Sequence, residues 1–200
     1  MKVIRSVFYI VIAGASVISA CSRQLVPGLR AGKAGPSYDS AAYNYDFVEA
    51  IRQKMLGNFA EAMKDFEQCI ALNPRSDASY YQMAQMVLSN GDLDSGKEYM
   101  KKAYELSPGN LWYSKVLAGI YYQHREIDSA IIVYEAAIKE YPEKTDLQLS
   151  LANLYSENQN YEKARNILNK LNSRYGVNET TTEALARTLI AEHKYRDALE

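Results

Sequence analysis

The hydrophobic positions of this chain repeat every 34 residues. When units are counted from residues 43, 77, 111, 145 and 179, Ala holds the eighth position of every unit, and a small residue holds the twentieth. Large apolar residues hold the seventeenth and twenty-fourth. A fixed period of this length indicates one structural unit that is copied and stacked. In that order the positions are Ala50, Ala84, Ala118, Ala152 and Ala186; Ala62, Gly96, Ala130, Ala164 and Ala198; Phe59, Leu93, Ile127, Tyr161 and Tyr195; and Phe66, Met100, Tyr134 and Leu168.

Each unit contains two stretches of helical periodicity, which a turn separates. Pro74, Pro108 and Pro142 lie 34 residues apart, near the end of their units. Because proline disrupts a helix, each is predicted to separate one unit from the first helix of the next. Small side chains at positions 8 and 20 allow the two helices of a unit to touch, while bulky ones fill the space around them. The pattern therefore predicts an all-α fold, an α-solenoid of stacked antiparallel helix pairs.

Local turn signals agree with this arrangement. Gly57 and Gly91 supply left-handed geometry after the first helix of their units, whereas Arg125 stands where the third unit lacks a glycine. We expect Arg125 to be strained or its turn to differ. Asn58, Asp92 and Asn160 are predicted caps of the second helices, and Glu61 would complete a capping box with Asn58.

These residues resemble the tetratricopeptide repeat (TPR), whose units have small residues at positions 8, 20 and 27. The resemblance covers residues 43–200 and implies a TPR superhelix in which the first helix of each unit, helix A, lines a concave groove. Positions 2, 5, 9, 12 and 13 would then face a ligand. They are Asn44, Phe47, Ile51, Lys54 and Met55; Ala78, Tyr81, Gln85, Leu88 and Ser89; Trp112, Lys115, Gly119, Tyr122 and Gln123; and Asp146, Leu149, Asn153, Ser156 and Glu157.

Five of these positions are candidates for a partner-binding surface. The groove of the first three units is apolar and aromatic, and exposed aromatic residues serve as anchors in protein interfaces. The alternative for each candidate is packing against a neighbouring helix. The candidates are Phe47, Tyr81, Trp112, Lys115 and Tyr122.

The carboxylate clamp of chaperone-binding TPR domains is missing from this sequence. The resemblance would require Lys and Asn at positions 5 and 9 of the first unit, but the chain has Phe47 and Ile51. Gln82 replaces the second Asn, and Trp112 and Val116 replace the two basic residues of the third unit. Binding of a chaperone C-terminal peptide in that manner is not expected.

The two ends of the array depart from the pattern. Positions 4, 7 and 11 of the first unit are polar, so we expect its first helix to be a cap with a water-facing side. The sequence stops at Glu200, within the second helix of the fifth unit, which indicates a fragment of a longer protein. The polar positions are Asp46, Glu49 and Gln53, and the apolar stripe of the same helix is Phe47, Ile51 and Met55.

The N-terminus is typical of a targeting signal. A basic start and an apolar run over residues 7–18 precede Ile18-Ser-Ala-Cys21, which resembles the lipobox of bacterial lipoproteins. The resemblance implies a signal peptide at 1–20, an acylated Cys21 with a flexible linker at 21–39, and the TPR array at 40–200. Cys21 is followed by Ser22 and not by Asp, which suggests attachment to the outer membrane of the bacterial cell envelope, on either of its two faces. An ordinary secretory signal is the alternative.

Composition and residue inventory argue against catalysis and nucleic-acid binding. The formal net charge is −1, so no basic excess exists to neutralise phosphates. The only histidines, His124 and His193, lie two units apart, and we expect no enzyme, metal or small-molecule cofactor. Cys69 occupies a small-residue position and is predicted to be an inert buried thiol. Asn178 of a glycosylation sequon is predicted to be a helix cap.

The sequence favours a lipid-anchored TPR scaffold or adaptor that binds a protein or peptide through its groove and the membrane through Cys21. Two alternatives remain open. One is a glycan-capture lipoprotein, against which the regular repeat length argues. The other is a docking or regulatory part of a longer protein whose activity lies beyond residue 200.

Overall fold

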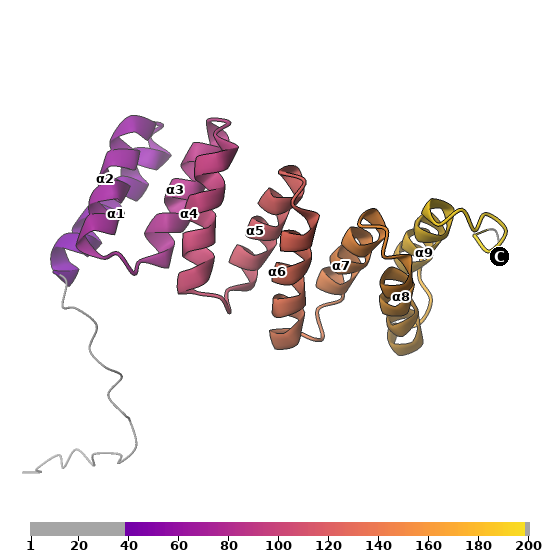
Figure 1. Cartoon of the computed structure of the whole chain (residues 1–200). Helices are drawn as coiled ribbons and strands as arrows, with labels where there is room; N and C mark the ends of the chain where they lie inside the picture. The colour runs from indigo at the N-terminus through magenta and orange to yellow at the C-terminus, as the bar shows by residue number, and fades with distance from the viewer. Residues whose placement is uncertain (1–38, 199–200) are drawn as a thin grey trace, which may run out of the picture. The chain divides into compact units, whose positions relative to one another are not determined.

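The computed structural model describes residues 39–198, in which nine α-helices and no strands occur. These helices follow one another along a row in chain order (Figure 1). The predicted signal peptide at 1–20 and Cys21 lie outside the described residues, as does all of the predicted linker except Asp39. The helices are α1 (Ser40–Met55), α2 (Phe59–Leu72), α3 (Asp77–Ser89), α4 (Leu93–Leu106), α5 (Leu111–Gln123), α6 (Ile127–Glu140), α7 (Thr145–Glu157), α8 (Tyr161–Tyr175) and α9 (Glu179–Ala191).

Each helix packs against its neighbours in the chain. The most extensive contacts join α1 to α2, α3 to α4, α5 to α6 and α7 to α8, and each pair also contacts the next. The four pairs therefore form helical hairpins of nearly equal length, each in contact with the one before it. The predicted all-α solenoid is confirmed, and the odd-numbered helices are the A helices of the repeat.

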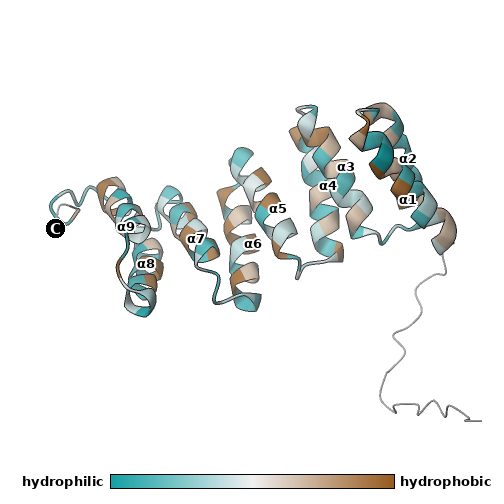
Figure 2. Ribbon diagram, turned by 180° about the vertical axis from the view of Figure 1, so that it is seen from behind, coloured by the Kyte–Doolittle hydropathy of each residue, from teal (hydrophilic) through white to brown (hydrophobic). Residues whose placement is uncertain are grey.

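The helices are amphipathic in the way that a stacked array requires. Hydrophobic and hydrophilic segments alternate along the helices in Figure 2. The small positions 8, 20 and 27 are buried in the first four units, as are Phe66, Met100 and Leu168 at position 24. Gly96 shows why small residues are needed, because an added Cβ would lie 2.4 Å from the Leu88 Cδ2 atom. Close approach of α3 and α4 thus depends on the missing side chain.

Side-chain caps define most helix starts. Asp92 and Asn160 accept hydrogen bonds from backbone N–H groups of α4 and α8, as predicted. Asn178 forms a capping box with Thr181 at the start of α9, which confirms its predicted role. The prediction for Asn58 is wrong, because its side chain caps nothing and no capping box with Glu61 forms.

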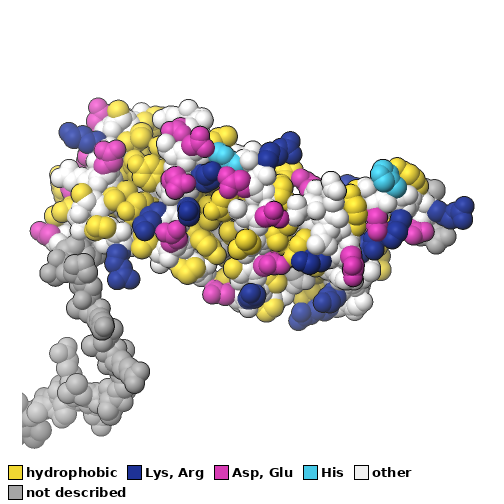
Figure 3. Space-filling view, in the orientation of Figure 1, with side chains coloured by type: hydrophobic (Ala, Val, Ile, Leu, Met, Phe, Trp, Pro, Cys, Tyr) yellow, Lys and Arg dark blue, Asp and Glu magenta, His cyan; other side chains and the backbone are white. Residues whose placement is uncertain are grey.

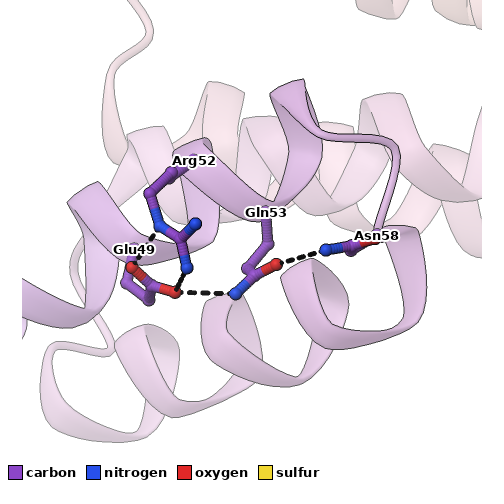
Figure 4. A network of polar contacts seen from close by, with 4 residues as sticks. All are labelled: Glu49, Arg52, Gln53 and Asn58. Atoms are coloured by element: carbon purple, nitrogen blue, oxygen red, sulfur yellow. Dashed lines mark hydrogen bonds and ion pairs between the residues drawn. The ribbon is translucent and has the colours of Figure 1, made fainter.

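A polar network along α1 explains the missing cap (Figure 4). Glu49 accepts hydrogen bonds from Arg52 and from Gln53, and the Gln53 side-chain oxygen accepts one of 2.7 Å from Asn58 Nδ2. These hydrogen bonds from Arg52 and Gln53 lower the pKa of the Glu49 carboxyl. The Asn58 amide is therefore engaged with helix α1 instead of the first turn of α2.

Turns after the A helices use left-handed backbone geometry whether or not glycine is present. Gly57 and Gly91 have φ angles of 81° and 83°, and Arg125, Gln159 and His193 have φ angles of 63°, 60° and 65°. The strain expected at Arg125 is thus present, because this region disfavours side chains. The Glu126 N–H donates to the Tyr121 carbonyl over 2.9 Å, which closes the turn in the manner of a Schellman motif.

Several predicted core positions are more exposed than expected. The large residue at the seventeenth position was expected in the core, but in three units it is exposed. Phe59, Leu93 and Tyr195 are 52%, 39% and 57% exposed. Phe59 and Leu93 are the first residues of their helices, and side chains there lean back over the turn and away from the core. Ala186 is only half-buried, because no helix after α9 covers it in the described part of the chain.

Helix α1 keeps part of its predicted apolar stripe. Phe47 and Ile51 pack against the core formed by Ala62, Phe66 and neighbouring residues. Met55 does not belong to this stripe, because it is 83% exposed at the last position of the helix.

Candidate functional site

The A helices are joined by hydrogen bonds between polar and aromatic side chains that lie about one repeat apart in the sequence. The bonds link α1 to α3, α3 to α5 and α5 to α7. The side chains come mainly from positions 2, 5, 9, 12 and 13, which are the positions predicted to face a ligand. We call this surface the A-helix groove. It consists of Lys54, Tyr81, Gln82, Gln85, Trp112, Lys115, Gly119, Tyr122, Asp146, Asn153 and Glu157.

An aromatic pair joins α3 to α5. The Trp112 Nε1 atom donates to the Tyr81 hydroxyl over 2.5 Å, and the Tyr81 ring stacks on Tyr113 with ring centroids 5.1 Å apart. Trp112 nevertheless remains 57% exposed. A large aromatic side chain is thus fixed in place while most of its surface stays in water, which is the usual condition of an interface anchor.

At the start of the groove, Lys54 of α1 reaches two amides of α3. Its Nζ atom donates to the Gln82 and Gln85 side-chain oxygens over 2.7 and 2.9 Å. Gln85 in turn donates to the Tyr81 hydroxyl over 2.5 Å. Burial lowers the pKa of the Lys54 ammonium. A continuous chain of hydrogen bonds therefore connects Lys54 to Trp112 across three helices.

Two contacts join α5 to α7. Lys115 Nζ lies 2.5 Å from the Asp146 carboxylate, and the pair lowers the pKa of Asp146. The Tyr122 hydroxyl donates to Glu157 over 2.9 Å, and this bond raises the pKa of Tyr122. Lys115 is therefore already neutralised within the chain, and Tyr122, which is 40% exposed, has a fixed ring position.

Phe47 lies differently from the other four candidates. It is half-buried and meets Phe66 edge-to-face at a centroid distance of 5.7 Å, while Tyr43 stacks on its other side. The structure therefore places Phe47 in the core between α1 and α2, which is the packing alternative considered for each candidate. Tyr81, Trp112, Lys115 and Tyr122 lie in the A-helix groove.

A hollow of about 290 Å³ opens between α5 and α7. A Cβ atom added at Gly119 would meet nothing within 4 Å, so this glycine widens the hollow. The volume is close to the lower limit of small-molecule sites, about 300 Å³, which suits one side chain of a partner. The hollow is lined by Gly119, Tyr122, Tyr134, Ser150, Asn153 and Glu157, among others.

Sequence reasoning singled out the aromatic residues but not their partners. Asp146, Glu157 and Gln85 stand at positions predicted to face a ligand, yet nothing in the sequence alone shows which residue they contact. The available signal is spacing, because Lys115 and Asp146 lie 31 residues apart and Tyr122 and Glu157 lie 35 apart. Donor and acceptor side chains separated by about one repeat therefore indicate contacts between successive A helices in this array.

The residues with chemical reactivity are scattered. His124 Nδ1 lies 3.7 Å from Asp94, whereas His193 Nδ1 lies 2.8 Å from the Tyr195 hydroxyl, so the histidines lie beside different partners. Cys69 is buried and free, and burial raises the pKa of its thiol to about 11, as expected for an unreactive thiol. Over residues 39–198, no group of three or more His, Cys, Asp or Glu side chains could hold a metal ion.

Lys and Arg side chains alternate with Asp and Glu over the face shown in Figure 3. In the part of the chain that the structure describes, we find no helix with the length and hydropathy needed to span a membrane.

The fold and the comparison with known proteins define the class of protein, which is a repeat protein built from stacked helical hairpins. Models of the tetratricopeptide repeat match residues 54–76, 77–110 and 128–179. The chain belongs to the tetratricopeptide repeat family.

A TPR repeat-containing protein of Bacillus subtilis (strain 168), YpiA, is 23% identical over 143 residues, which is 72% of this chain. The match spans 34% of that relative, about a third of its length. At this level of identity and coverage, the relative supports the repeat family.

Solved structures show the same fold. The crystal structure of MamA protein superimposes with a TM-score of 0.66 at 14% identity, covering 79% of this chain and 86% of that one. A tetratricopeptide repeat protein from Parabacteroides merdae gives 0.68 at 17% identity, with coverages of 79% and 63%. TPR arrays typically act as non-catalytic scaffolds for protein interaction, and the fold favours that class here.

Proposed function

We propose that this chain is a scaffold or adaptor that binds an extended segment of a protein partner along the A-helix groove. The observation that carries this proposal is Trp112, a large aromatic side chain that is held by a hydrogen bond to Tyr81 and yet is more than half exposed. Aromatic residues fixed before binding lose little side-chain entropy when a partner arrives. Tyr122 of α5 is held in a similar way by its hydrogen bond to Glu157 of α7. It extends the aromatic surface to the contact between these two helices.

The hydrogen bonds between A helices support a preformed site. They tie each A helix of the groove to the next, so the spacing of Tyr81, Trp112 and Tyr122 is fixed before a ligand binds. The hollow beside Gly119 adds a place for one partner side chain next to these rings. A segment that follows the array would meet the aromatic pair first and this hollow one unit later.

Alanine substitution of the anchors tests the proposal. We expect Trp112→Ala and Tyr81→Ala each to weaken partner binding by about 2 kcal/mol or more, the range of interface hot spots. Ile132→Ala is the matched control, because Ile132 is 65% exposed on α6, outside the A-helix groove. Affinity capture followed by calorimetry on the captured partner measures the effect. Full binding by both groove variants would contradict the proposal, as would Trp112-dependent binding of oligosaccharides without any protein partner.

We further propose that Cys21 anchors the protein in the bacterial cell envelope, with the outer membrane as its destination. The support is the sequence Ile18-Ser-Ala-Cys21 after a basic start and an apolar run of twelve residues. Acyl chains bind lipid at about 0.8 kcal/mol per buried methylene, so a multiply acylated cysteine would hold the protein firmly.

Labelling with radioactive palmitate tests the anchor. The wild-type protein should incorporate label and sediment with membranes, whereas Cys21→Ala should incorporate none and appear in the soluble fraction. Cys69→Ala is the control, because Cys69 is buried in the array and should not affect labelling. Unchanged membrane association of Cys21→Ala would contradict lipid anchoring.

A further inference from the structure

Helix α1 carries apolar side chains on two opposite sides. Phe47 and Ile51 pack into the core of the first hairpin. On the other side Tyr45, Val48 and Met55 are each more than half exposed, and their spacing places them along one stripe of the helix. A helix that is apolar all round is normally covered all round. No helix of residues 39–198 covers this stripe.

Two further apolar residues extend the stripe where α1 ends and α2 begins. Leu56 follows α1 directly and Phe59 is the first residue of α2, and both are more than half exposed. Residues 45–59 thus hold five of the thirteen large hydrophobic side chains that are exposed in the described part of the chain. Such a concentration marks a contact surface. We call it the α1 patch, and it consists of Tyr45, Val48, Met55, Leu56 and Phe59.

The first helix lacks the water-facing polar side that was expected of a cap. Asp46, Glu49 and Gln53 are half-buried and lie away from the stripe. Arg52 lies within the stripe, but its Nε atom donates to Glu49 over 2.8 Å, so its charge is neutralised inside the helix (Figure 4). The outer side of α1 therefore presents apolar side chains and one closed ion pair, where an end unit of a solenoid normally presents polar residues.

The chain that precedes α1 indicates what covers the α1 patch. Ser40, the first residue of the helix, comes 19 residues after Cys21, and a segment of this length spans at most about 65 Å. The proposed anchor therefore keeps α1 close to the bilayer. Residues 22–37 contain Arg23, Arg30 and Lys33 and no Asp or Glu. Anionic headgroups attract a segment of this charge, which favours a short distance between α1 and the membrane surface.

We propose that the α1 patch lies on the lipid bilayer, with its apolar side chains in contact with the acyl chains. This contact rests on the proposed anchoring through Cys21, because a tethered surface binds a nearby membrane even where its own affinity is weak. The ring of Tyr45 suits the boundary between headgroups and acyl chains, and Val48 and Met55 suit the hydrocarbon below it. The contact fixes the orientation of α1 on the membrane, which a tether alone leaves free.

Quenching of tryptophan fluorescence by brominated lipids tests this contact. The mature chain of the proposal, which starts at Cys21, is coupled through the Cys21 thiol to a maleimide lipid in vesicles of phosphatidylethanolamine and phosphatidylglycerol. This coupling supplies an anchor at the same residue whether or not the cell acylates it. Cys69 does not compete for the maleimide, because it is buried and burial raises the pKa of its thiol to about 11.

Val48→Trp reports on the α1 patch, and Ile132→Trp is the matched control, because Ile132 is similarly exposed but lies on α6. Both are made in a chain with Trp112→Phe, so that each protein has one tryptophan. We expect brominated acyl chains to reduce the fluorescence of Val48→Trp about twofold or more, because the apolar side of an interfacial helix reaches the acyl region. Ile132→Trp should not change. Adding Tyr45→Ser and Met55→Ser should restore the fluorescence of Val48→Trp.

Quenching of Val48→Trp that does not exceed quenching of Ile132→Trp would overturn the membrane contact. If the unquenched chain also forms a dimer in solution that Val48→Asp dissociates, a second copy covers the α1 patch instead. The outcome is separate from the test of acylation. Palmitate labelling in the cell without quenching on vesicles would leave the anchor intact and remove the membrane contact. Quenching without palmitate labelling would support the contact and remove the proposed anchor.

Discussion

Single residues show most clearly how the repeat pattern becomes structure. The small residues at the helix contacts can be predicted from the sequence. Two glycines lie inside helices, Gly96 at position 20 in α4 and Gly119 at position 9 in α5. Their surroundings differ, however. A Cβ at Gly96 would lie 2.4 Å from Leu88, whereas a Cβ at Gly119 would meet nothing within 4 Å. The first glycine allows two helices to touch, and the second opens a hollow in the groove.

Replacing these glycines by alanine should therefore change stability in opposite directions. Gly119→Ala removes the cost of glycine in a helix and should raise the free energy of unfolding by about 0.5–1 kcal/mol. Gly96→Ala gains the same helix preference but crowds Leu88, and overpacking of about 1–3 kcal/mol should dominate. Urea unfolding measures both changes. Shifts of the same sign in the two variants would contradict the packing described for α3 and α4.

The Lys115–Asp146 pair predicts a specific response to acid. Because the pair lowers the pKa of Asp146 below its ordinary value of 3.8, its contribution to stability is present above that pH and is lost as the pH falls through the lower, folded-state pKa. Thermal unfolding measured from about pH 5 to about pH 2 should show a smaller loss of stability in Asp146→Asn than in wild type. Lys115→Gln should match Asp146→Asn. If both variants lose as much stability at acid pH as the wild type does, the pair is not formed in solution.

At the scale of helices and turns, the sequence predicted the order of the helices as far as the first helix of the fifth unit, because proline and turn residues recur with the same spacing. The second helix of the fifth unit, expected from Tyr195, is not formed in the described residues, where 195–198 form a turn. The sequence predicted the caps Asp92 and Asn160 from the same recurring spacing. It did not predict that the Asn58 amide would bond to Gln53, because that contact depends on how the α1 side chains Glu49, Arg52 and Gln53 connect across a turn. Local preference was overridden by a network that only the folded hairpin brings together.

The turns after the A helices yield a prediction of their own. Arg125 and Gln159 adopt left-handed backbone angles that Gly57 and Gly91 adopt without strain. Arg125→Gly should therefore raise the free energy of unfolding by up to about 1 kcal/mol, since a side chain in this region costs about 1–2 kcal/mol and glycine loses some entropy. Gly91→Ala should lower it by a similar amount. Chemical denaturation of the two variants compares them directly, and a stabilising Gly91→Ala would be inconsistent with the turn geometry.

At the scale of the whole array, the repeat period was sufficient to predict the solenoid, while the resemblance to the TPR family gave the helix face on which a ligand is expected. Four of the five candidate residues lie in the A-helix groove, while Phe47 packs into the first hairpin against Phe66. The pairing of side chains between units could not be predicted, since contacts such as Lys54 with Gln82 depend on the angle between successive hairpins. The chemistry of the groove, with an unpaired lysine near its start and paired charges further along, emerges only when the hairpins are assembled.

Photo-crosslinking in the native cell is the most direct test of partner binding in the A-helix groove. A photoreactive phenylalanine analogue would be placed at Gly119 or Ser89, which stand at positions predicted to face a ligand. As controls it would be placed at Ile132 or Lys101, exposed residues of the B helices α6 and α4. We predict that both groove positions yield a covalent adduct with the same protein and that the two B-helix positions do not. Adducts from Ile132 or Lys101 alone, with none from Gly119 and Ser89, would contradict binding in the groove.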